Sequence, residues 1–360
     1  MSKDYIILQT VAPDYRRKLY DYIKQEFGDS FAVYAGLDYF ETTVKTDTNI
    51  VSFKQIKNNF FLNRAFLIQT GMWKDVINCH ILVMEMNPRI LSNWGTLLVR
   101  KILNKKTILW GHAWPRSGSK SKTDKLRKIM RDMGDSIIVY TKSQKEELVL
   151  AQPHLKVNYA PNALYFKDEM NVCAKETSES IHDLIYVGRL TDLKKPKLLL
   201  QAFHKAIPHL DEDVNLVFVG DGEEKKGLET YVIENKLEHR VVLTGHVSDY
   251  SKLAELYSKA LFSVSPGYIG LSVTQSFGFG VPMIVSKDEN HSPEIEAVNE
   301  KENALFFQTD NLENFKDVIL QVFKDKENWI KRRQHICENC KEQYSINAMG
   351  DTFIKLFHEK

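Results

Sequence analysis

Two basic residues follow an apolar run in the second half of the chain, and their types and spacing suit a diphosphate. The run Asp183–Val187 ends at Gly188, and Arg189 and Lys194 come next. Glycine lets the backbone turn tightly, and a guanidinium fork and an ammonium five residues later can converge on two phosphate groups. A solvated basic loop leading into a helix is the alternative interpretation.

The stretch 265–282 predicts a second anion-binding element, the start of a helix. A strand ends in a loop of proline and glycine, and a helix is expected to begin near Gly270, Leu271 and Ser272. The free amides and the positive dipole end of such a helix favour a phosphate. Alternatively, Ser272 only caps the helix and the glycines only permit close packing.

Two more glycine-containing loops follow strands, Gly220-Asp221-Gly222-Glu223 and Thr244-Gly245-His246-Val247. The first lacks the last glycine of a G-x-G-x-x-G motif, and the chain has no G-x-x-x-x-G-K-[ST]. An NAD or FAD enzyme and a P-loop NTPase are therefore disfavoured.

The elements that position these residues alternate between short apolar runs and helical segments, which predicts two Rossmann-like domains with parallel sheets. We expect domains at 1–166 and 180–345, joined by a polar linker at about 167–182. In the first domain the pattern predicts strands at 5–8, 31–34, 81–84, 107–110 and 136–140 and a helix at 15–27. In the second it predicts strands at 183–188, 215–220, 241–245, 260–264 and 282–285 and a helix at 197–207.

The order of these motifs resembles the nucleotide-sugar-binding half of the family 4 glycosyltransferases. The resemblance covers about residues 183–297 and rests on Tyr186-Val187-Gly188-Arg189-Leu190 with Lys194, Phe218-Val219-Gly220-Asp221-Gly222, Leu243-Thr244-Gly245 and Gly280-Val281-Pro282. It implies the α/β GT-B fold, in which two Rossmann-like domains face each other across a cleft. It also implies that a C-terminal helix, about 346–360, packs back on the first domain.

The resemblance further implies a retaining hexosyltransferase that uses a UDP- or GDP-sugar, with no cofactor and no metal. Arg189 and Lys194 would hold the diphosphate and stabilise its charge as it leaves. The residues expected around the donor are Gly188, Asp221, Val247, Gly270, Leu271, Ser272, Gln275 and Glu294.

This chain departs from the family pattern at two glutamates that are usually eight positions apart. Gly267 and Gln275 stand at the matching positions. Gln275 can still bond ribose hydroxyls, whereas Gly267 cannot replace a carboxylate. Glu294 would supply a compensating carboxylate, although a helix start at Pro293 explains the same residues.

His112 is the candidate from the first half. It follows the predicted strand 107–110 and lies beside Trp110 and Trp114. By resemblance it would contact the donor sugar, and a buried structural histidine is the alternative.

The first half is basic. Residues 1–170 carry 26 Lys and Arg against 17 Asp and Glu, and the rest of the chain carries 23 against 30. Seven basic residues lie in 116–131, where we expect Arg116, Lys120 and Lys122 to contact an anionic acceptor or a membrane surface. A solvated face is the alternative. For 53–73 we expect a helix, either in the core or at a membrane interface.

The partners expected are a nucleotide-sugar donor and a glycan or polyprenyl-pyrophosphate-linked acceptor, with peripheral membrane contact. No zinc spacing, basic zipper or RNA-binding motif is present, so nucleic acid is not expected. The pair Cys337 and Cys340 lacks a second pair at zinc spacing and is interpreted as chance.

Composition places the protein among globular chains, with 43% hydrophobic and 27% charged residues. Without a long apolar run or an export signal, we expect it in the cytoplasm, at the inner face of the cell membrane. The predicted function is sugar transfer in surface polysaccharide biosynthesis. A non-catalytic nucleotide-sugar-binding protein and a UDP-sugar epimerase of the same fold are the alternatives.

Overall fold

The computed structural model describes residues 3–41, 44–115, 118–172 and 180–359, and the chain divides into two compact units. The first contains Met1–Leu164 and Ile346–Lys360, and the second contains Tyr165–Ser345. Each has its own parallel sheet and hydrophobic core. In the predicted linker, Met170 is buried in the second unit, and residues 173–179 lie outside the described residues.

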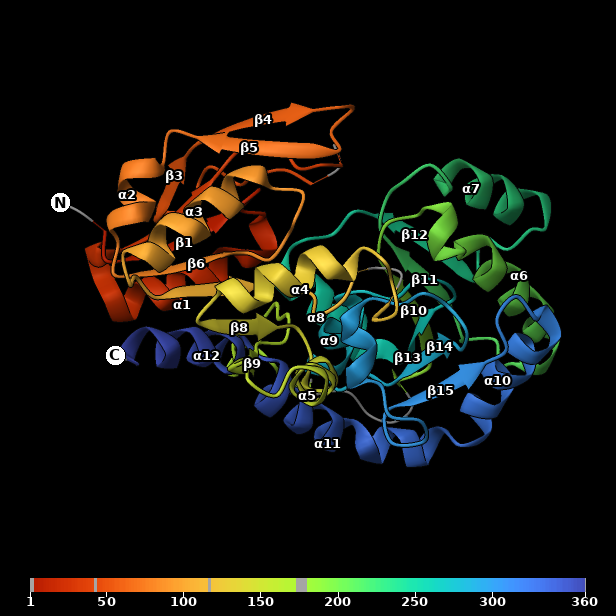
Figure 1. Ribbon diagram of the computed structural model, residues 1–360. Coiled ribbons are helices and arrows are strands. Elements are labelled where there is room, and N and C mark those ends of the chain that lie inside the picture. The colour runs from red at the N-terminus through yellow and green to blue at the C-terminus, as the bar shows by residue number, and fades with distance from the viewer. Residues whose placement is uncertain (1–2, 42–43, 116–117, 173–179, 360) are drawn as a thin grey trace. The chain divides into compact units, whose positions relative to one another are not determined.

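Seven parallel strands form the sheet of the first unit, in the order β3-β2-β1-β6-β7-β8-β9 (Figure 1). The five strands predicted in this half are present, and the central ones are almost wholly buried, as in parallel sheets that are covered on both faces. The strands are β1 (Tyr5–Gln9), β2 (Phe31–Ala35), β3 (Phe53–Gln55), β6 (Ile81–Glu85), β7 (Thr107–Trp110), β8 (Ser136–Val139) and β9 (Val157–Tyr159).

The helices of this unit include the last one of the chain. The C-terminal helix α12 lies beside α1 (Figure 1), and its Phe353 and Phe357 rings lie 4.8 and 5.1 Å from the rings of Trp110 and Tyr5. The expected helix at the C-terminus therefore contributes to the core of the first unit. The helices are α1 (Arg17–Phe27), α2 (Trp73–Asn78), α3 (Leu91–Ile102), α4 (Asp124–Met133), α5 (Lys142–Ala151) and α12 (Ile346–His358).

The helix expected at 53–73 is wrong. The segment forms β3 and then an antiparallel hairpin of β4 (Lys57–Phe61) and β5 (Phe66–Thr70). Leu62, Asn63 and Arg64 at its turn all have positive φ angles, which a helix does not permit. Aromatic and β-branched residues fit a pleated surface, and in this segment they pair across two antiparallel strands, although their spacing also suits a helix.

Six parallel strands form the sheet of the second unit, in the order β12-β11-β10-β13-β14-β15. The five predicted strands of this half are confirmed, and β15 is added at the edge. The strands are β10 (Asp183–Val187), β11 (Leu216–Val219), β12 (Val241–Gly245), β13 (Ala260–Ser265), β14 (Met283–Ser286) and β15 (Ala304–Phe307).

Local signals set where several helices of the second unit begin. Pro196 stands at the first position of α6, and the side chains of Asp249 and Asn311 accept backbone N–H bonds at the starts of α8 and α10. The helices are α6 (Pro196–Ala206), α7 (Lys225–Glu234), α8 (Tyr250–Lys259), α9 (Ser272–Gly278), α10 (Leu312–Lys324) and α11 (Lys326–Tyr344).

Cys337 and Cys340 lie one helical turn apart on α11 and are both buried. Their thiols donate to the backbone carbonyls of Gly278 and Thr274 at 3.2 and 3.4 Å. Burial raises the pKa of both thiols, which keeps them protonated. They pack α11 against α9.

Candidate active site

The sheet of the second unit reverses its strand order between β10 and β13. The chain first builds outward through β11 and β12, then returns to add β13 on the other side of β10. Ligands of such sheets bind outside the carboxyl ends of the strands at this reversal. The loops that follow Val187 and Ser265 meet there.

Backbone hydrogen bonds join the loops at this edge. The N–H of Gly188 donates to Val219 O at 3.0 Å, and that of Leu190 donates to Asp221 O at 2.9 Å. A Cβ on Gly220 would lie 1.8 Å from the Gly188 carbonyl oxygen. The glycine is required because the two backbones touch.

Lys194 is the cation at the centre of this edge. Its ammonium donates to Tyr268 O at 2.6 Å and lies 4.8 Å from the centre of the Tyr268 ring. It also lies 3.8 Å from the place where Gly270 would carry a Cβ. The loops after β10 and β13 are therefore connected through this side chain.

Burial and a neighbouring cation lower the pKa of Lys194 to about 8. Burial is the largest cause, repulsion by Arg189 adds to it, and attraction by Glu294 opposes it. Arg189 is exposed and Glu294 is buried. The structure thus brings two other predicted site residues, Arg189 and Glu294, within electrostatic reach of Lys194.

Gly267 has no room for a side chain. A Cβ there would lie 2.4 Å from the Leu193 carbonyl oxygen, and the same oxygen accepts the N–H of Tyr268 at 3.0 Å. A backbone atom cannot move aside as the end of a side chain can. The loop after β13 therefore excludes the glutamate that the resembled family carries at this position.

The helix start expected at Gly270, Leu271 and Ser272 is present, because α9 begins at Ser272. Ser272 is the first helical residue, Leu271 stands at the cap, and no side chain caps the helix. The alternative in which Ser272 caps α9 is therefore wrong. Gly270, Leu271 and Ser272 are all half-buried.

Glu294 and Gln275 are held by partners within the second unit. Ser292 Oγ donates to the Glu294 carboxylate, and Gln275 Nε2 donates to the Tyr165 hydroxyl at 2.7 Å. Pro293 opens a short 3₁₀ helix of residues 293–297, as the alternative interpretation of this segment predicted.

Asp221 and Val247 lie on the neighbouring loops. Asp221 is exposed, and the backbone N–H of Gly222 and the ammonium of Lys225 lower its pKa. Val247 is half-buried after β12. Both therefore follow carboxyl ends of strands in this sheet.

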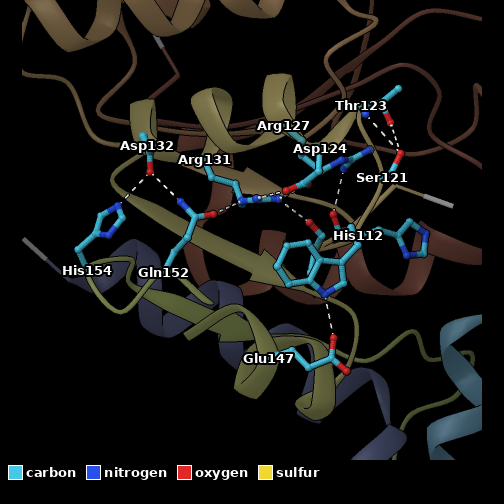
Figure 2. A network of polar contacts seen from close by, with 12 residues as sticks. His112, Ser121, Thr123, Asp124, Arg127, Arg131, Asp132, Glu147, Gln152 and His154 are labelled. Atoms are coloured by element: carbon cyan, nitrogen blue, oxygen red, sulfur yellow. Dashed lines mark hydrogen bonds and ion pairs between the residues drawn. The ribbon is translucent and has the colours of Figure 1, made fainter. Parts of the chain in front are cut away.

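His112 belongs to the first unit and is exposed, so the buried-histidine alternative is wrong. Its ring lies 4.7 Å from the Tyr140 ring. One nitrogen of Arg127 donates to the carbonyl oxygen of His112 at 2.9 Å (Figure 2). The same nitrogen donates to the carbonyl oxygen of Met86 at 2.9 Å, and so joins the loops after β7 and β6.

Arg131 is buried beneath the same loop. Its guanidinium forms a bidentate pair with Asp124 at 3.0 and 2.9 Å and donates to Ala113 O at 2.7 Å and to Gln152 Oε1 at 2.7 Å (Figure 2). The Trp114 indole adds a bond to Glu147 at 2.8 Å. Residues 112–114, which follow β7 closely, are therefore held in place by these contacts.

This network corrects the interpretation of the basic run. Of its seven cations, Arg127 and Arg131 point inward and hold the loop that carries His112. Lys120 and Lys122 are exposed, as expected for surface contacts, and Arg116 lies outside the described residues.

Sequence reasoning missed the residues at the strand reversal of the first sheet, between β1 and β6. Glu85, the last residue of β6, accepts bonds from the N–H and the hydroxyl of Thr10 at 3.0 and 2.7 Å. A carboxylate directly after the apolar run 81–84 was the available signal. A cavity of about 630 Å³ lies nearby at the ends of β2 and β3, lined by Leu37, Asp38, Gln55, Ile56, Lys57, Asn58, Thr70 and Gly71.

Among the described residues, no group of three or more His, Cys, Asp or Glu side chains is arranged to hold a metal ion. None of the helices in the described part of the chain is both long and apolar enough to cross a bilayer.

The comparisons with known proteins agree with this geometry. Residues 174–343, which contain the whole strand reversal of the second unit, match the family described as glycosyl transferases group 1. The match supports a GT-B glycosyltransferase. No curated protein sequence matches the chain.

Solved structures of the GT-B fold match the whole chain. Anabaena HepE, solved in complex with UDP, is 12% identical with a TM-score of 0.71, and each chain is covered to 100%. A glycosyltransferase from Rickettsia africae is 15% identical with a TM-score of 0.71, covering 99% of this chain and 98% of that one. Sucrose-phosphate synthase from Thermosynechococcus elongatus is 17% identical with a TM-score of 0.68, each chain being covered to 99%. The likeness establishes the GT-B fold that the sequence predicted.

Proposed function

We propose that the chain is a retaining, metal-independent hexosyltransferase that takes its sugar from a nucleoside diphosphate. The observation that carries the proposal is the placement of Lys194 and Arg189 at the strand reversal of the matched unit. Two cations that repel each other in the free protein are stabilised when a dianion binds between them. UDP is favoured over GDP because similar structures were solved with UDP.

The same groups stabilise the departing diphosphate. Negative charge on the diphosphate grows as the bond to the sugar breaks, and a fixed ammonium in a partly desolvated site stabilises that charge strongly. Gly270, Leu271 and Ser272 at the start of α9 would add backbone N–H donors next to Lys194. Glu294 and Gln275 would bind sugar and ribose hydroxyls, and His112 would contact the sugar.

The proposed acceptor is a glycan or a polyprenyl-pyrophosphate-linked sugar in surface polysaccharide synthesis, met at the inner face of the cell membrane. Its support is the basic first half and the cavity in the first unit, where Asp38, Gln55, Lys57 and Thr70 offer donors and acceptors for hydroxyl groups.

The first experiment measures the melting temperature of the full chain with UDP, GDP, ADP and TDP, each with and without EDTA. A ligand that binds only the folded state raises the midpoint by mass action. We expect UDP to raise it most and the shift to survive EDTA. A shift that EDTA abolishes would overturn metal independence, and no shift with any nucleotide would overturn the donor site.

Gly267 favours one rival function. The loop excludes the glutamate that the resembled family carries. A non-catalytic nucleotide-sugar-binding protein would not need this carboxylate. Release of UDP from a UDP-sugar, in the absence of acceptor, argues for catalysis. Formation of a new UDP-sugar without free UDP would instead show an epimerase.

A further inference from the structure

Helix α3 of the first unit buries mostly polar side chains and exposes apolar ones. Its buried residues include Ser92, Asn93, Thr96 and Arg100, and Leu97 is the one apolar member of that set. A surface helix ordinarily buries its apolar stripe and exposes its polar one. In α3 the polar side chains face the protein interior.

The buried polar side chains of α3 make hydrogen bonds, so this arrangement is a built feature. Among the described residues of α3, Asn93 Oδ1 is the one buried side-chain polar atom without a partner. Asn93 donates to Glu85 O at 2.8 Å, and Ser92 Oγ accepts the N–H of Gln69 at 3.1 Å. The Arg100 guanidinium is fully buried and donates to Thr107 Oγ1 at 2.9 Å and to carbonyl oxygens including that of Val76, at 2.7 Å. The helix is therefore fixed in this orientation.

The outward face of α3 is apolar and continues onto α4. Leu91, Gly95, Leu98 and Ile102 follow one another at the spacing of a single helical face. α4 packs beside α3, on the same face of the sheet (Figure 1). The α3–α4 surface consists of apolar side chains that are each 43 to 71% exposed: Leu91, Leu98, Ile102, Leu103, Leu126 and Ile129.

Cations outnumber acids around these apolar side chains. Residues 86–133, up to the end of α4, contain 12 Lys and Arg and two acids, Asp124 and Asp132. The Asp132 carboxylate bonds the side chains of Gln152 and His154. Asp124 is neutralised by Arg131 beneath the surface. Lys101 on α3 and Lys125 and Lys128 on α4 are exposed. An apolar face with an excess of positive charge complements an anionic lipid surface, into which the apolar groups insert while the lysines meet phosphates.

We propose that the α3–α4 surface is the membrane-docking face of this protein, with an anionic bilayer as its occupant. The proposal rests on the proposed function, because a lipid-linked acceptor lies in the bilayer and gives the protein a reason to bind there. It differs from the surface expected from the sequence, which was the basic run 116–131. In the proposed surface, the apolar side chains of α3 insert into the bilayer, and the lysines attract its anionic headgroups.

A flotation assay with the full chain, without substrates, tests the proposal. The vesicles are phosphatidylcholine alone or phosphatidylcholine with about a third phosphatidylglycerol. We expect binding to the anionic vesicles, weakened by salt because exposed charges are screened. Leu98→Ser with Ile102→Ser should reduce the bound fraction about tenfold or more, and Lys125→Glu with Lys128→Glu should abolish the preference for anionic lipid.

Matched controls lie on α7 of the second unit. Ile233 is 64% exposed, close to the 71% of Ile102, and Lys226 is also exposed. Ile233→Ser and Lys226→Glu should bind vesicles like wild type. Far-UV circular dichroism and the melting temperature confirm that every variant folds, and the UDP-induced melting shift should be unchanged in all of them.

Equal flotation of wild type and the Leu98/Ile102 variant would overturn the proposal, as would equal binding to neutral and anionic vesicles. Loss of self-association in that variant, with flotation unchanged, would assign the face to a second copy of the chain instead. The UDP shift is read separately, so failure of docking and failure of the donor site are distinguishable.

Discussion

At the scale of single residues, the surroundings of Lys194 disfavour its charge in the free protein and would favour it with a diphosphate bound. The ammonium is partly desolvated next to Arg189, and these two causes lower its pKa to about 8. A bound diphosphate would raise that pKa by adding negative charge beside the ammonium. The side chain is therefore strained electrostatically in the free protein and relieved by the proposed donor.

The lowered pKa predicts a pH dependence of opposite sign for stability and for binding. Between about pH 8 and the ordinary lysine value, the unfolded chain binds more protons at this site, so Lys194 makes the free protein more stable as pH rises. UDP affinity should fall over the same range because the cation is lost. Melting curves with and without UDP from pH 7 to 10 check both slopes, and Lys194→Met should remove both differences.

Removing either cation should slow sugar transfer. Arg189→Ala and Lys194→Ala are each expected to lose about 2–4 kcal/mol of transition-state stabilisation, the size seen for donors that stabilise developing charge. Steady-state kcat/KM with a UDP-sugar measures the loss. Lys226→Glu serves as a charge control on α7, and turnover at the wild-type rate in either alanine variant would contradict the diphosphate assignment.

Position 267 should not accept the glutamate that the resembled family carries there. Gly267→Ala already places a Cβ against the Leu193 carbonyl oxygen, and overpacking of this kind costs about 1–3 kcal/mol. We expect a lower melting temperature and a weaker UDP shift for Gly267→Ala and for Gly267→Glu. Gly227→Ala is the control, since a Cβ there meets nothing within 4 Å.

At the scale of elements, buried arginines connect loops that carry candidate site residues. Arg131 pairs with Asp124 within α4 and ties this helix to the segment after β7 through Ala113 O, and Arg127 ties the loop of His112 to that of Met86. The sequence places both arginines in a run that looks like a basic surface. On α4 both side chains point inward, where each donates hydrogen bonds to more than one acceptor.

Breaking the Arg131 network should destabilise the first unit. Arg131→Met leaves the Asp124 carboxylate without its bidentate partner, and removing one member of a buried ion pair costs about 3–5 kcal/mol. Chemical denaturation measures the loss. Arg131→Met combined with Asp124→Leu should recover a large part of it, whereas the additive sum of the two single losses would show that the pair is not coupled.

At the scale of the whole molecule, two separate cores imply two folding units, one of them closed by the C-terminus. Phe353 is fully buried and packs on Trp110 in the first unit. Phe353→Ala should cost about 3–5 kcal/mol, as large core deletions do. Hydrogen exchange should accelerate across Met1–Leu164 and remain unchanged in β10 to β14. Equal acceleration in both units would show a single cooperative core.

Much of this architecture follows from local sequence patterns. Apolar runs such as Leu184–Val187 are typical of buried strands, glycines mark where their carboxyl ends turn, and the resemblance in the order of the motifs predicted the GT-B fold. Arg189 could be placed near the edge of the sheet for the same reason, because a residue that closely follows a buried strand has a place fixed by that strand, whereas the place of Lys194 depends on the turn after it.

Other features depend on contacts between segments far apart in the chain. The hairpin of β4 and β5 replaces a predicted helix because its aromatic residues find a pleated partner. Gly267 is required by a carbonyl oxygen at Leu193, 74 positions earlier. The sequence by itself determined the buried central strands of both sheets and which residues follow them. Only the tertiary structure decided that Arg131 faces inward and Ile102 outward, because orientation depends on which partners a fold brings within reach.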